Sequence, residues 1–530
     1  MCENIVCALK ERADLPLGVQ DFTNLRARKR LYVDKTALLQ KLAEEGDNYF
    51  LARPRRFGKS LTLSTLEAMF EGRRELFYGL ACEAWVCENA KHPNPVLHLD
   101  MSGMRPYGNA QELNEAIACQ LLDIAAVKGL GLSYEKSAEG YLIALLRTLY
   151  QQYGSVVVLI DEYDAPILNV IDDDEKARSY REVLRSFYLL LKSSVQMLRF
   201  VFLTGISKFS KTGVFSALNT LTDISMSEEY GSLTGYTQEE VEQYFEPFFA
   251  TALQRLNYTD RTELLSAVKE YYDGYSFDGI TKIYNPYSIL CFFKNYRLDN
   301  YWYTTGLPSS LARYLIKQKA FEPYRYTNYS VFSDFSDTTE IEDASVESFL
   351  YQSGYLTIIK REGESLLLDY PNREVQKSLA RLYQSLVYKV PDYKKLAENV
   401  WQALRDGNLE KLIELYNAEL AAIPYDDYRI PKSEGFYRAV FLVMLRSVDV
   451  PVYAEVHTHK GRCDCSIELS HTVYIFECKV ARDHAEIARK REEGRKQIDE
   501  KGYAEPYAND TRSLVCASIV IDAKEHRAYL

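Results

Sequence analysis

The chain has 530 residues, of which 47% are hydrophobic and 26% are charged, a composition typical of globular proteins that excludes a mainly disordered chain. Its length suits three to four domains of about 150 residues each. The 64 Lys and Arg residues against 75 Asp and Glu residues give a net charge of −11. This balance excludes a protein that coats nucleic acid through overall positive charge, although a local basic groove remains compatible with it.

The cysteines and the apolar segments indicate the compartment. The ten cysteines include no C-x-x-C pair, which predicts free thiols in a reducing compartment instead of a zinc site. The N-terminal apolar stretch Ile5–Leu9 is too short for a signal peptide. The longest apolar run, Ala439–Leu445, is far below the roughly 18 residues of a membrane span. We therefore expect a soluble, cytoplasmic protein without a membrane partner.

Short runs of β-branched and aromatic residues alternate with helical patterns over the first part of the chain, to about residue 230. The predicted strands are 49–51, 96–99, 156–160 and 199–204. Strands separated by helices predict a parallel sheet covered on both faces.

The remaining chain divides by pattern. A helical stretch is followed by a small mixed and helical region, and then by a block of order α-β-β-β-α-β. The fold class is therefore predicted to be α/β, with a central parallel sheet, a helical and mixed middle, and a separate C-terminal α/β domain. The predicted domains are 1–235, 236–330, 331–425 and 426–530.

A phosphate-binding loop is predicted between the first strand and the helix that follows it. The segment Arg53–Ser60 matches G-x-x-x-x-G-K-[ST] except at its first position, where arginine replaces glycine. In such a loop, backbone N–H groups face phosphate, the lysine binds the β- and γ-phosphates, and the hydroxyl binds Mg²⁺. A basic loop before an ordinary helix is the alternative. The nucleotide-binding candidates are Arg55, Arg56, Phe57, Gly58, Lys59 and Ser60.

A second feature supports nucleotide binding. The apolar strand Val156–Ile160 ends in Asp161 and Glu162. A carboxylate at the carboxyl end of a central parallel strand lies where Mg²⁺-bound phosphate sits in phosphate-loop folds. Asp161 would hold Mg²⁺ directly or through water, and Glu162 would polarise the attacking water.

Further candidates for nucleotide hydrolysis are less specific. At the end of the third strand, Thr204 or Ser207 could sense the γ-phosphate, with a capped turn as the equal alternative. Fast hydrolysis also needs an arginine finger. The candidates, which sequence cannot rank, are Arg181, Arg185 and Arg199.

A carboxylate constellation lies in the C-terminal block. Glu477 and Lys479 are two apart on a predicted strand and so share a face, and Asp464 lies on the neighbouring strand. Two carboxylates can hold Mg²⁺ or Mn²⁺, while an ammonium orients or deprotonates water and neutralises charge on phosphate. A solvated strand face is the alternative for any one of these residues. Glu434, at a helix start, is a further metal-ligand candidate.

The helix over 484–501 supplies supporting groups. Gln497 would contact phosphate or the water, and five basic side chains would form a DNA-backbone surface, with a simple solvated helix as competitor. These basic residues are Arg489, Lys490, Arg491, Arg495 and Lys496. His457 and His459 are interpreted as structural or surface residues, and Glu455 as a further ligand if its strand face permits.

Several strings of residues resemble known families. The segments Leu15–Phe22, Leu31–Thr36 and Arg53–Ser60 resemble the AAA-ATPase-like family of bacterial proteins. The match continues through Tyr272–Tyr275, Tyr301–Trp302, Thr305–Gly306 and Gly354–Thr357. The C-terminal motifs Gly461–Asp464 and Glu477–Lys479 are similar to the PD-(D/E)XK nuclease domain commonly fused to this ATPase.

The resemblance implies a phosphate-loop ATPase fold joined to a restriction-endonuclease-like domain, with ATP and Mg²⁺ or Mn²⁺ as cofactors. By motif, Lys59 and Ser60 would bind nucleotide and Asp161 and Glu162 would form the acidic pair. A nuclease triad of Asp464, Glu477 and Lys479, supported by Glu434 and Gln497, is also implied. In that family a residue other than glycine is usual at the position of Arg53. The sequence departs from the pattern where Cys463 and Cys465 flank Asp464, and where the nearest tyrosine after Gln497 is Tyr503.

We therefore expect an ATP-regulated, metal-dependent nuclease acting on DNA. A nucleotide-dependent switch or scaffold whose C-terminal domain binds without cutting is the first alternative, and an RNA-directed nuclease is the second. Nucleic acid, DNA in the first instance, is the expected partner, with a homo-oligomer as a further expectation.

Overall fold

The computed structural model describes residues 14–103, 108–171, 173–208, 221–302, 309–336, 344–428, 430, 432–458 and 460–530. Thr305, Gly306 and His459 lie outside the described residues, as do the side chains of Glu455 and His457. The chain forms two compact units, Met1–Trp302 with Asn328–Arg373, and Tyr303–Thr327 with Glu374–Leu530. Within the described ranges, every helix is too short or too polar to cross a membrane.

Five parallel strands in the order β2-β3-β4-β1-β5 form the central sheet of the first unit. They are β1 (Asn48–Ala52), β2 (Val96–Asp100), β3 (Val156–Asp161), β4 (Leu198–Gly205) and β5 (Leu221–Asp223). All residues of β3 are buried, as expected for a central strand covered on both faces. The predicted parallel sheet is confirmed. β5 is an additional edge strand, which pattern analysis missed because its three residues carry one hydrophobic side chain.

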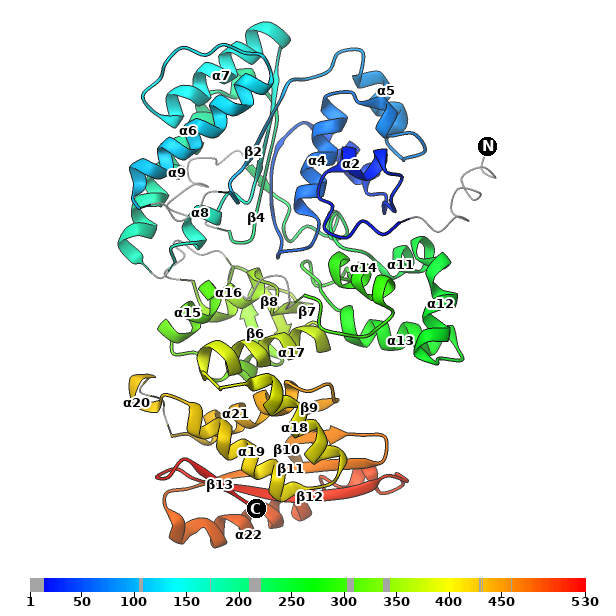
Figure 1. Cartoon of the computed structure of the whole chain (residues 1–530), viewed down its shortest axis with the longest axis vertical. Helices are drawn as coiled ribbons and strands as arrows, with labels where there is room; N and C mark the ends of the chain where they lie inside the picture. The colour runs from blue at the N-terminus through cyan, green and yellow to red at the C-terminus, as the bar shows by residue number, and fades with distance from the viewer. Residues whose placement is uncertain are drawn as a thin grey trace. The chain divides into compact units, whose positions relative to one another are not determined.

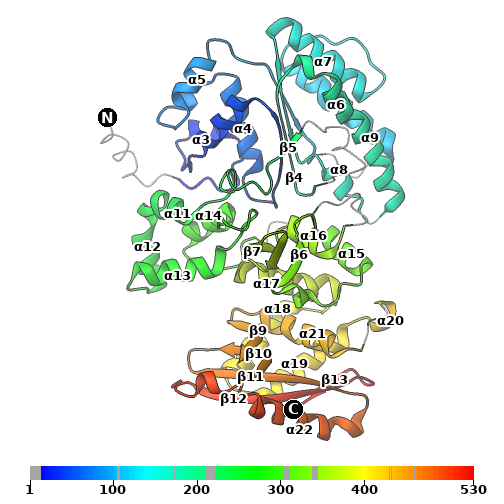
Figure 2. The same ribbon diagram turned by 180° about the vertical axis from the view of Figure 1, so that it is seen from behind.

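Helices cover both faces of this sheet. Figures 1 and 2 show α4 and α5 on one side and α6, α7 and α9 on the other. The helices are α2 (Phe22–Ala27), α3 (Thr36–Glu45), α4 (Lys59–Phe70), α5 (Glu83–Asn89), α6 (Ala110–Val127), α7 (Ala138–Tyr153), α8 (Ala165–Leu168) and α9 (Asp174–Ser193). Apolar residues of α4, among them Leu63 and Leu66, pack in one core cluster with Phe200 and Phe202 of β4. This packing fixes the start of α4 next to the carboxyl ends of the strands.

A helical extension and a small sheet complete the first unit. The helices are α11 (Gln238–Tyr244), α12 (Glu246–Leu256), α13 (Arg261–Tyr272), α14 (Pro286–Asn295) and α16 (Val346–Gln352). The antiparallel sheet β6-β8-β7 comprises β6 (Tyr329–Phe332), β7 (Thr357–Glu362) and β8 (Ser365–Asp369). Phe245, Phe248 and Phe293 belong to the aromatic core of the extension. The hydroxyl of Thr357 donates to the carbonyl of Ser276 at 2.9 Å, which joins the small sheet to the helical extension.

The second unit begins with a series of helices. They are α15 (Ser309–Lys317), α17 (Arg373–Leu382), α18 (Tyr393–Arg405), α19 (Leu409–Ala422), α20 (Tyr425–Tyr428) and α21 (Glu434–Arg446), with a π-turn at Tyr383–Val387. Of these helices, α19 and α21 contact the sheet of the unit. Ser433 caps α21, and every residue from Ala439 to Arg446 is buried. The long apolar run of the sequence is therefore a core helix.

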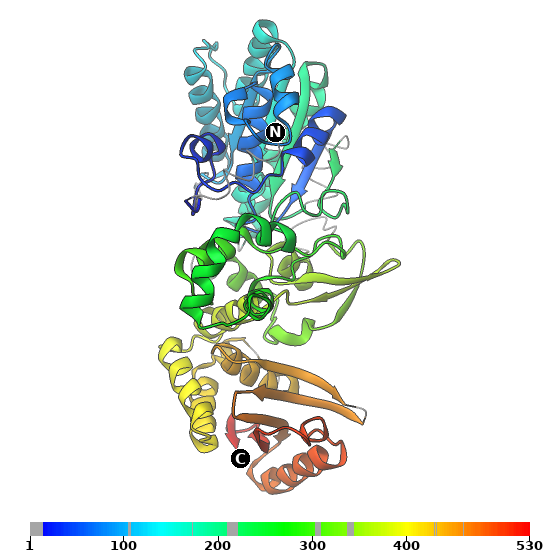
Figure 3. The same cartoon turned by 90° about the vertical axis from the view of Figure 1, so that its right-hand side faces the viewer.

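The sheet of the second unit has the order β13-β12-β11-β10-β9. It comprises β9 (Val452–Thr458), β10 (Gly461–Glu468), β11 (Thr472–Ala481), β12 (Ser513–Asp522) and β13 (Arg527–Tyr529), with α22 (Ile487–Glu500) between β11 and β12. β11 and β12 are parallel and the other neighbours are antiparallel. Figure 3 shows α22 on the opposite side of the sheet from α18 and α19. The predicted α-β-β-β-α-β order is confirmed, with β13 as one further strand.

Candidate functional sites

The phosphate loop connects β1 to α4 with two residues in the left-handed region. Arg56 has φ 70° and Gly58 has φ 92°. A left-handed backbone is nearly free of cost for glycine but strained for arginine. α4 starts at Lys59 directly after Gly58, so the free N–H groups of its first turn lie at the loop. This is the backbone arrangement that binds anions.

Lys59 is buried and rests on the loop itself. Its side chain is 5% exposed, and Nζ donates to the carbonyl oxygens of Arg53 at 3.0 Å and Pro54 at 3.2 Å. Burial lowers the pKa of Lys59, while the nearby charges of Glu162 and Asp161 oppose that shift. The ammonium therefore holds two neutral partners that a phosphate could replace. Ser60 follows it, partly buried, in the first turn of α4.

Aromatic residues of the helical extension hold the loop from outside. The Phe57 ring is 4.8 Å from that of Tyr275 and 5.5 Å from that of Phe277. The Arg56 guanidinium lies 4.9 Å from the ring of Tyr287. Arg55, by contrast, is exposed. The loop conformation thus depends on residues more than two hundred positions away in the sequence.

Arg53, at the position usually held by glycine, points away from the phosphate side. It is 1% exposed and lies 4.3 Å above the ring of Phe277. Its Nη1 donates to the carbonyls of Ala52 at 2.9 Å and Ser225 at 2.6 Å. Nε and Nη2 have no hydrogen-bond partner among the described residues. Burial lowers the pKa of Arg53 to about 10. The arginine is a buried anchor for the base of the loop.

Two carboxylates lie at the carboxyl end of β3, where Asp161 is the last residue of the strand and Glu162 follows it. Asp161 is 4% exposed, and its Oδ1 accepts from the Thr204 hydroxyl at 2.6 Å. Glu162 has φ 46°, a strained conformation for a residue other than glycine. Burial raises the pKa of Glu162, and the charges of Lys59 and Arg55 oppose that shift. Lys59, Asp161 and Glu162 are therefore brought within electrostatic range of one another.

Asp164 is a third acid of this group, which sequence analysis did not select. It is 1% exposed and accepts from the backbone N–H and the hydroxyl of Ser207 and from the N–H of Ile206. Burial raises its pKa. Thr204 and Ser207, considered as phosphate sensors, thus each donate to a carboxylate of the β3 end. The signal that could have revealed Asp164 is its spacing, three residues after Asp161 where a buried strand ends.

The three candidate arginine fingers lie in different places. Arg181, on α9, is 9% exposed, and Arg185 pairs with Glu182 at 3.8 Å. Arg199 is at the amino end of β4, where its Nη2 donates to the Ala43 carbonyl at 3.0 Å. Strands rise about 3.3 Å per residue, so Arg199 lies some 20 Å from the carboxyl end of β4. Arg199 therefore cannot act on a phosphate held by the phosphate loop of the same chain.

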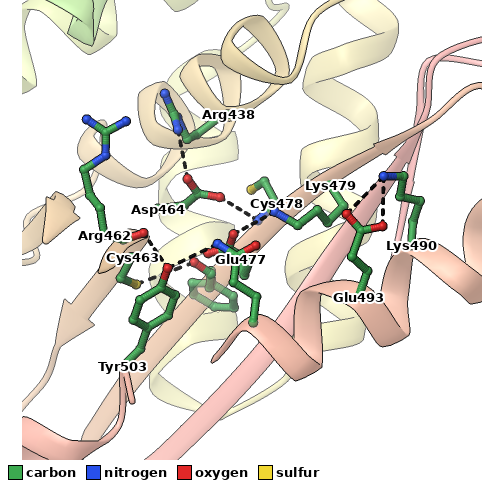
Figure 4. A network of polar contacts seen from close by, with 12 residues as sticks. Arg438, Arg462, Cys463, Asp464, Glu477, Cys478, Lys479, Lys490, Glu493 and Tyr503 are labelled. Carbon is green, nitrogen blue, oxygen red and sulfur yellow. Dashed lines mark hydrogen bonds and ion pairs between the residues drawn. The ribbon is translucent and has the colours of Figure 1, made fainter. Parts of the chain in front are cut away.

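The carboxylates of the second unit converge where β10 and β11 meet (Figure 4). Asp464 is 7% exposed; its Oδ2 accepts from the backbone N–H of Cys478 at 2.9 Å. Its Oδ1 accepts from Arg438 Nη1 at 2.9 Å. Both oxygens of Asp464 therefore already have donors. Cys478 itself is buried.

Glu477 and Lys479 form a buried pair beside Asp464. Lys479 Nζ is 2.8 Å from Glu477 Oε1, and Glu477 is 1% exposed. Glu477 Oε2 has no hydrogen-bond partner among the described residues. Burial, together with the charge of Asp464, raises the pKa of Glu477 to about 7. Burial opposes the charge on Lys479, but the hydrogen bond to Glu477 and the charges of Glu477, Glu434 and Asp464 together outweigh it, so the pKa of Lys479 is raised.

Gln497 and Tyr503 are joined across the turn that follows α22. Gln497 Nε2 donates to Tyr503 Oη at 3.1 Å, and Tyr503 Oη donates to the carbonyl of Arg462 at 2.6 Å. The tyrosine six residues after the glutamine thus contacts it directly and ties it to β10. Glu434 is exposed at the start of α21, and its charge acts on both Glu477 and Lys479.

α22 packs closely on this site. A Cβ at Gly494 would lie 2.9 Å from Ser518 Cβ and 3.4 Å from Lys479 Cγ, so only glycine fits there. The basic residues of α22 largely pair along the helix. Arg489 pairs with Glu486 and Glu493, Lys490 with Glu493, and Lys496 with Glu500. This pattern reduces the free positive charge that the helix can offer to DNA.

The residues fit a divalent cation of the kind that keeps most of its own water. No group of three or more His, Cys, Asp and Glu side chains that could enclose a metal ion occurs within the described part of the chain. Mg²⁺ is commonly bound through one or two carboxylates together with water and substrate phosphate. Asp464 and Glu477 supply two carboxylates, and the unpaired Oε2 of Glu477 supplies a buried oxygen that needs a partner.

Arg438 is the residue of this site that sequence analysis missed. It follows Glu434 by four positions on α21, a spacing that places both residues on one helix face. This spacing is the signal by which the sequence could have indicated Arg438. Its contact with Asp464, on a strand 26 positions later, required the tertiary structure.

Comparison with known proteins agrees with this architecture. A family model described as "Predicted AAA-ATPase" matches residues 16–215, and one described as "PD-(D/E)XK nuclease superfamily" matches residues 432–528. The chain is 35% identical over 508 residues, 94% of each chain, to the "Uncharacterized protein in vnfD 5'region" of Azotobacter chroococcum mcd 1. The ORC2 protein of Aeropyrum pernix, in its ADPNP-ADP complexes, covers 71% of this chain and 97% of its own, with 11% identity and a TM-score of 0.28.

The two family matches contain the two sites described above. The first spans the phosphate loop and the acidic end of β3, and the second spans Asp464, Glu477 and Lys479. The relative in Azotobacter is similar over nearly the whole length of both chains. The chain therefore belongs to the AAA-ATPase-like family and carries a C-terminal domain of the PD-(D/E)XK nuclease superfamily.

Proposed function

We propose that this protein binds and hydrolyses ATP and that its C-terminal domain is an Mg²⁺- or Mn²⁺-dependent nuclease acting on DNA. The observation that carries the proposal is the buried cluster on β10 and β11. There Lys479 Nζ lies 2.8 Å from Glu477 Oε1, Asp464 lies next to them, and Glu477 Oε2 is buried without a partner. A domain that only binds has no need of such an arrangement, because burying charge is costly.

Each residue of the cluster has a role in the proposed cleavage. Asp464 and Glu477 would hold the cation, with Glu434 as an outer carboxylate. The cation would supply Lewis-acid polarisation of the scissile phosphate. Lys479 would orient the attacking water and neutralise charge that develops on the phosphate. Gln497, held by Tyr503, would contact the phosphate or the water.

In the first unit, Lys59 and the N–H groups of residues 55–60 would bind the ATP phosphates. Ser60 and Asp161 would hold the Mg²⁺ that accompanies ATP, and Glu162 would polarise the attacking water. A pocket next to the loop suits the base and ribose. Its lining residues include Tyr32, Gly58, Leu61, Thr62, Thr234 and Pro286. The buried hydroxyl of Thr234 has no partner among the described residues, so it offers one hydrogen bond to the nucleotide.

The test is a cleavage assay on linear, circular and single-stranded DNA and on RNA, with Mg²⁺ or Mn²⁺, with and without ATP. We expect wild type to cut DNA and Lys479→Ala to cut at least about 100-fold more slowly, the usual effect of losing one electrostatic group in a site. Lys411→Ala, which removes an exposed lysine of α19 paired with Glu414, is the matched control and should cut like wild type.

The remaining outcomes separate the alternatives. Cutting by Lys479→Ala at the wild-type rate would place the active site elsewhere. Cutting of RNA alone would replace DNA by RNA as substrate. Absence of cutting on every substrate would favour a nucleotide-dependent switch whose C-terminal domain binds without cleavage. A change of rate with ATP would show that the two units are coupled.

A further inference from the structure

Each of the two carboxylates at this site already has a cationic partner. Arg438 pairs with Asp464 at 2.9 Å and Lys479 with Glu477 at 2.8 Å. Figure 4 shows Arg438 reaching from α21 to Asp464. In this state a divalent cation would compete with Arg438 and Lys479 for the carboxylates. We therefore expect weak binding of the cation unless a positive charge leaves or a negative charge arrives.

Of the two donors to Asp464, only Arg438 can move away. The other donor is the backbone N–H of Cys478, which the strand holds in place. A carboxylate oxygen has room for more than one partner, so Oδ2 can keep that bond and still bind a cation. The guanidinium at Oδ1 differs, because it brings a full positive charge to Asp464, which opposes the approach of a second cation. Asp464 is available to bind the divalent cation once Arg438 has moved away from it.

A phosphate can take the place of Asp464 as an anionic partner of Arg438. The Arg438 side chain is 23% exposed, and removing an ion-pair partner from such a partly buried charge is unfavourable without replacement. The planar guanidinium matches a phosphate group with two parallel hydrogen bonds. The proposed reaction brings a phosphodiester to this site, within reach of the same side chain.

We propose that Arg438 is a positioning residue that exchanges Asp464 for a phosphate of the nucleic acid, so that nucleic acid and divalent cation bind the site cooperatively. This inference rests on the proposed nuclease function and adds its regulation. Without nucleic acid the ion pair with Arg438 keeps Asp464 from the cation. With nucleic acid bound, the phosphate takes Arg438 and Asp464 is free to bind. The coupling is reciprocal, because each ligand must change the affinity of the other by the same factor.

The test measures Mn²⁺ affinity by calorimetry on the full chain, with and without a phosphorothioate DNA duplex that resists hydrolysis. For wild type we expect the duplex to tighten Mn²⁺ binding about tenfold, a common size for such coupling. Arg438→Ala should bind Mn²⁺ about tenfold more tightly than wild type without duplex, and should gain little when duplex is added. Arg438→Lys keeps the charge at Asp464, so its affinity without duplex should stay near that of wild type.

A change of Mn²⁺ affinity in the opposite direction would identify a purely structural role for Arg438. If Arg438 only orients Asp464, Arg438→Ala weakens Mn²⁺ binding, and that result overturns the proposal. Equal Mn²⁺ affinity of wild type with and without duplex also overturns it. Arg405→Ala removes an exposed arginine of α18 paired with Asp406 and should retain the wild-type coupling. Because no turnover is measured, coupling in a protein that fails to cut would refute the nuclease proposal alone.

Discussion

The two candidate sites hold their charged residues in different ways. In the phosphate loop, Lys59 rests on two backbone carbonyls and Asp161 accepts from the hydroxyl of Thr204, so each charge has neutral partners. At the carboxylate site, Asp464 and Glu477 each pair with a cation. A phosphate easily replaces a neutral partner of Lys59, because charge-assisted hydrogen bonds are stronger. On the functions proposed above, the first site would take up phosphate directly, whereas the second would exchange one ion pair for another.

Two buried ionisable groups away from the sites also differ. The first unit buries a cation, Arg53, with Nε and Nη2 unpaired among the described residues. The second unit buries an acid, Glu419, whose Oε2 accepts from Gln384 at 2.9 Å and whose pKa is raised by burial to about 8. Arg53 keeps its charge and lies above the ring of Phe277. Glu419, by contrast, is protonated and neutral at pH 7. These two groups thus meet the cost of burial in different ways, and three variants test how individual charges are held.

The largest expected effect is that of Lys59→Ala. We expect ATP affinity to fall about 100-fold, because a charge-assisted hydrogen bond to phosphate contributes about 1.5–3 kcal/mol. The free energy of unfolding should change little, since the hydrogen bonds of Nζ within the described residues go to two backbone carbonyls. Binding is measured by calorimetry. Lys91→Ala, which removes an exposed lysine paired with Glu88, is the control. Unchanged ATP binding by Lys59→Ala would refute the phosphate-loop assignment.

The next effect concerns stability and pH at Glu419. Its pKa is about 8 in the folded state against 4.5 in the unfolded chain. A raised pKa means that the folded state holds a proton that the unfolded state loses. The resulting stability is complete below pH 4.5 and is lost as pH rises through 8.

Glu419→Gln replaces the titrating carboxyl group with an amide that does not ionise. Between pH 6 and 8, wild type should lose about 2 kcal/mol of unfolding free energy relative to Glu419→Gln, as measured by urea unfolding. Glu414→Gln, at an exposed acid of the same helix, should follow the wild-type pH dependence. A parallel pH dependence of wild type and Glu419→Gln would show that Glu419 is ionised in the folded protein.

The smallest effect on binding is expected for Arg53→Gly, which restores glycine at the first loop position. ATP affinity should stay within about threefold, because Arg53 points toward Phe277 and Ser225. The unfolding free energy should fall by about 1–2 kcal/mol through loss of the ring contact and two hydrogen bonds. Arg55→Gly, at the exposed neighbour, should weaken ATP binding more. A tenfold loss of ATP affinity in Arg53→Gly would contradict the anchoring role.

Patterns along the chain were enough to predict much of the architecture. The run Val156–Ile160 predicted a central strand because every residue is apolar, and β3 is buried throughout. The spacing of Glu477 and Lys479 predicted one shared face, because strand side chains alternate with period two. Such features depend on neighbours in sequence, so local spacing determines them.

Other features depended on residues that meet only after folding. The strings at Tyr272–Tyr275 and Gly354–Thr357 carried a family resemblance but no visible role in sequence. In the structure, Tyr275 contacts Phe57, and a Cβ at Gly354 would lie 2.8 Å from Pro54. Both strings therefore pack on the phosphate loop. No local periodicity encodes these contacts.

The amino-acid sequence by itself determined which residues are available: the lysine of the loop, the acids at the ends of strands, and the E-x-K pair. Tertiary structure decided which partner each charge received. Arg438 reached Asp464, Ser207 reached Asp164, and Arg53 turned to Phe277. The reason is physical, because hydrogen bonds and ion pairs act over a few ångströms. Which groups come that close is set by the packing of whole helices and sheets.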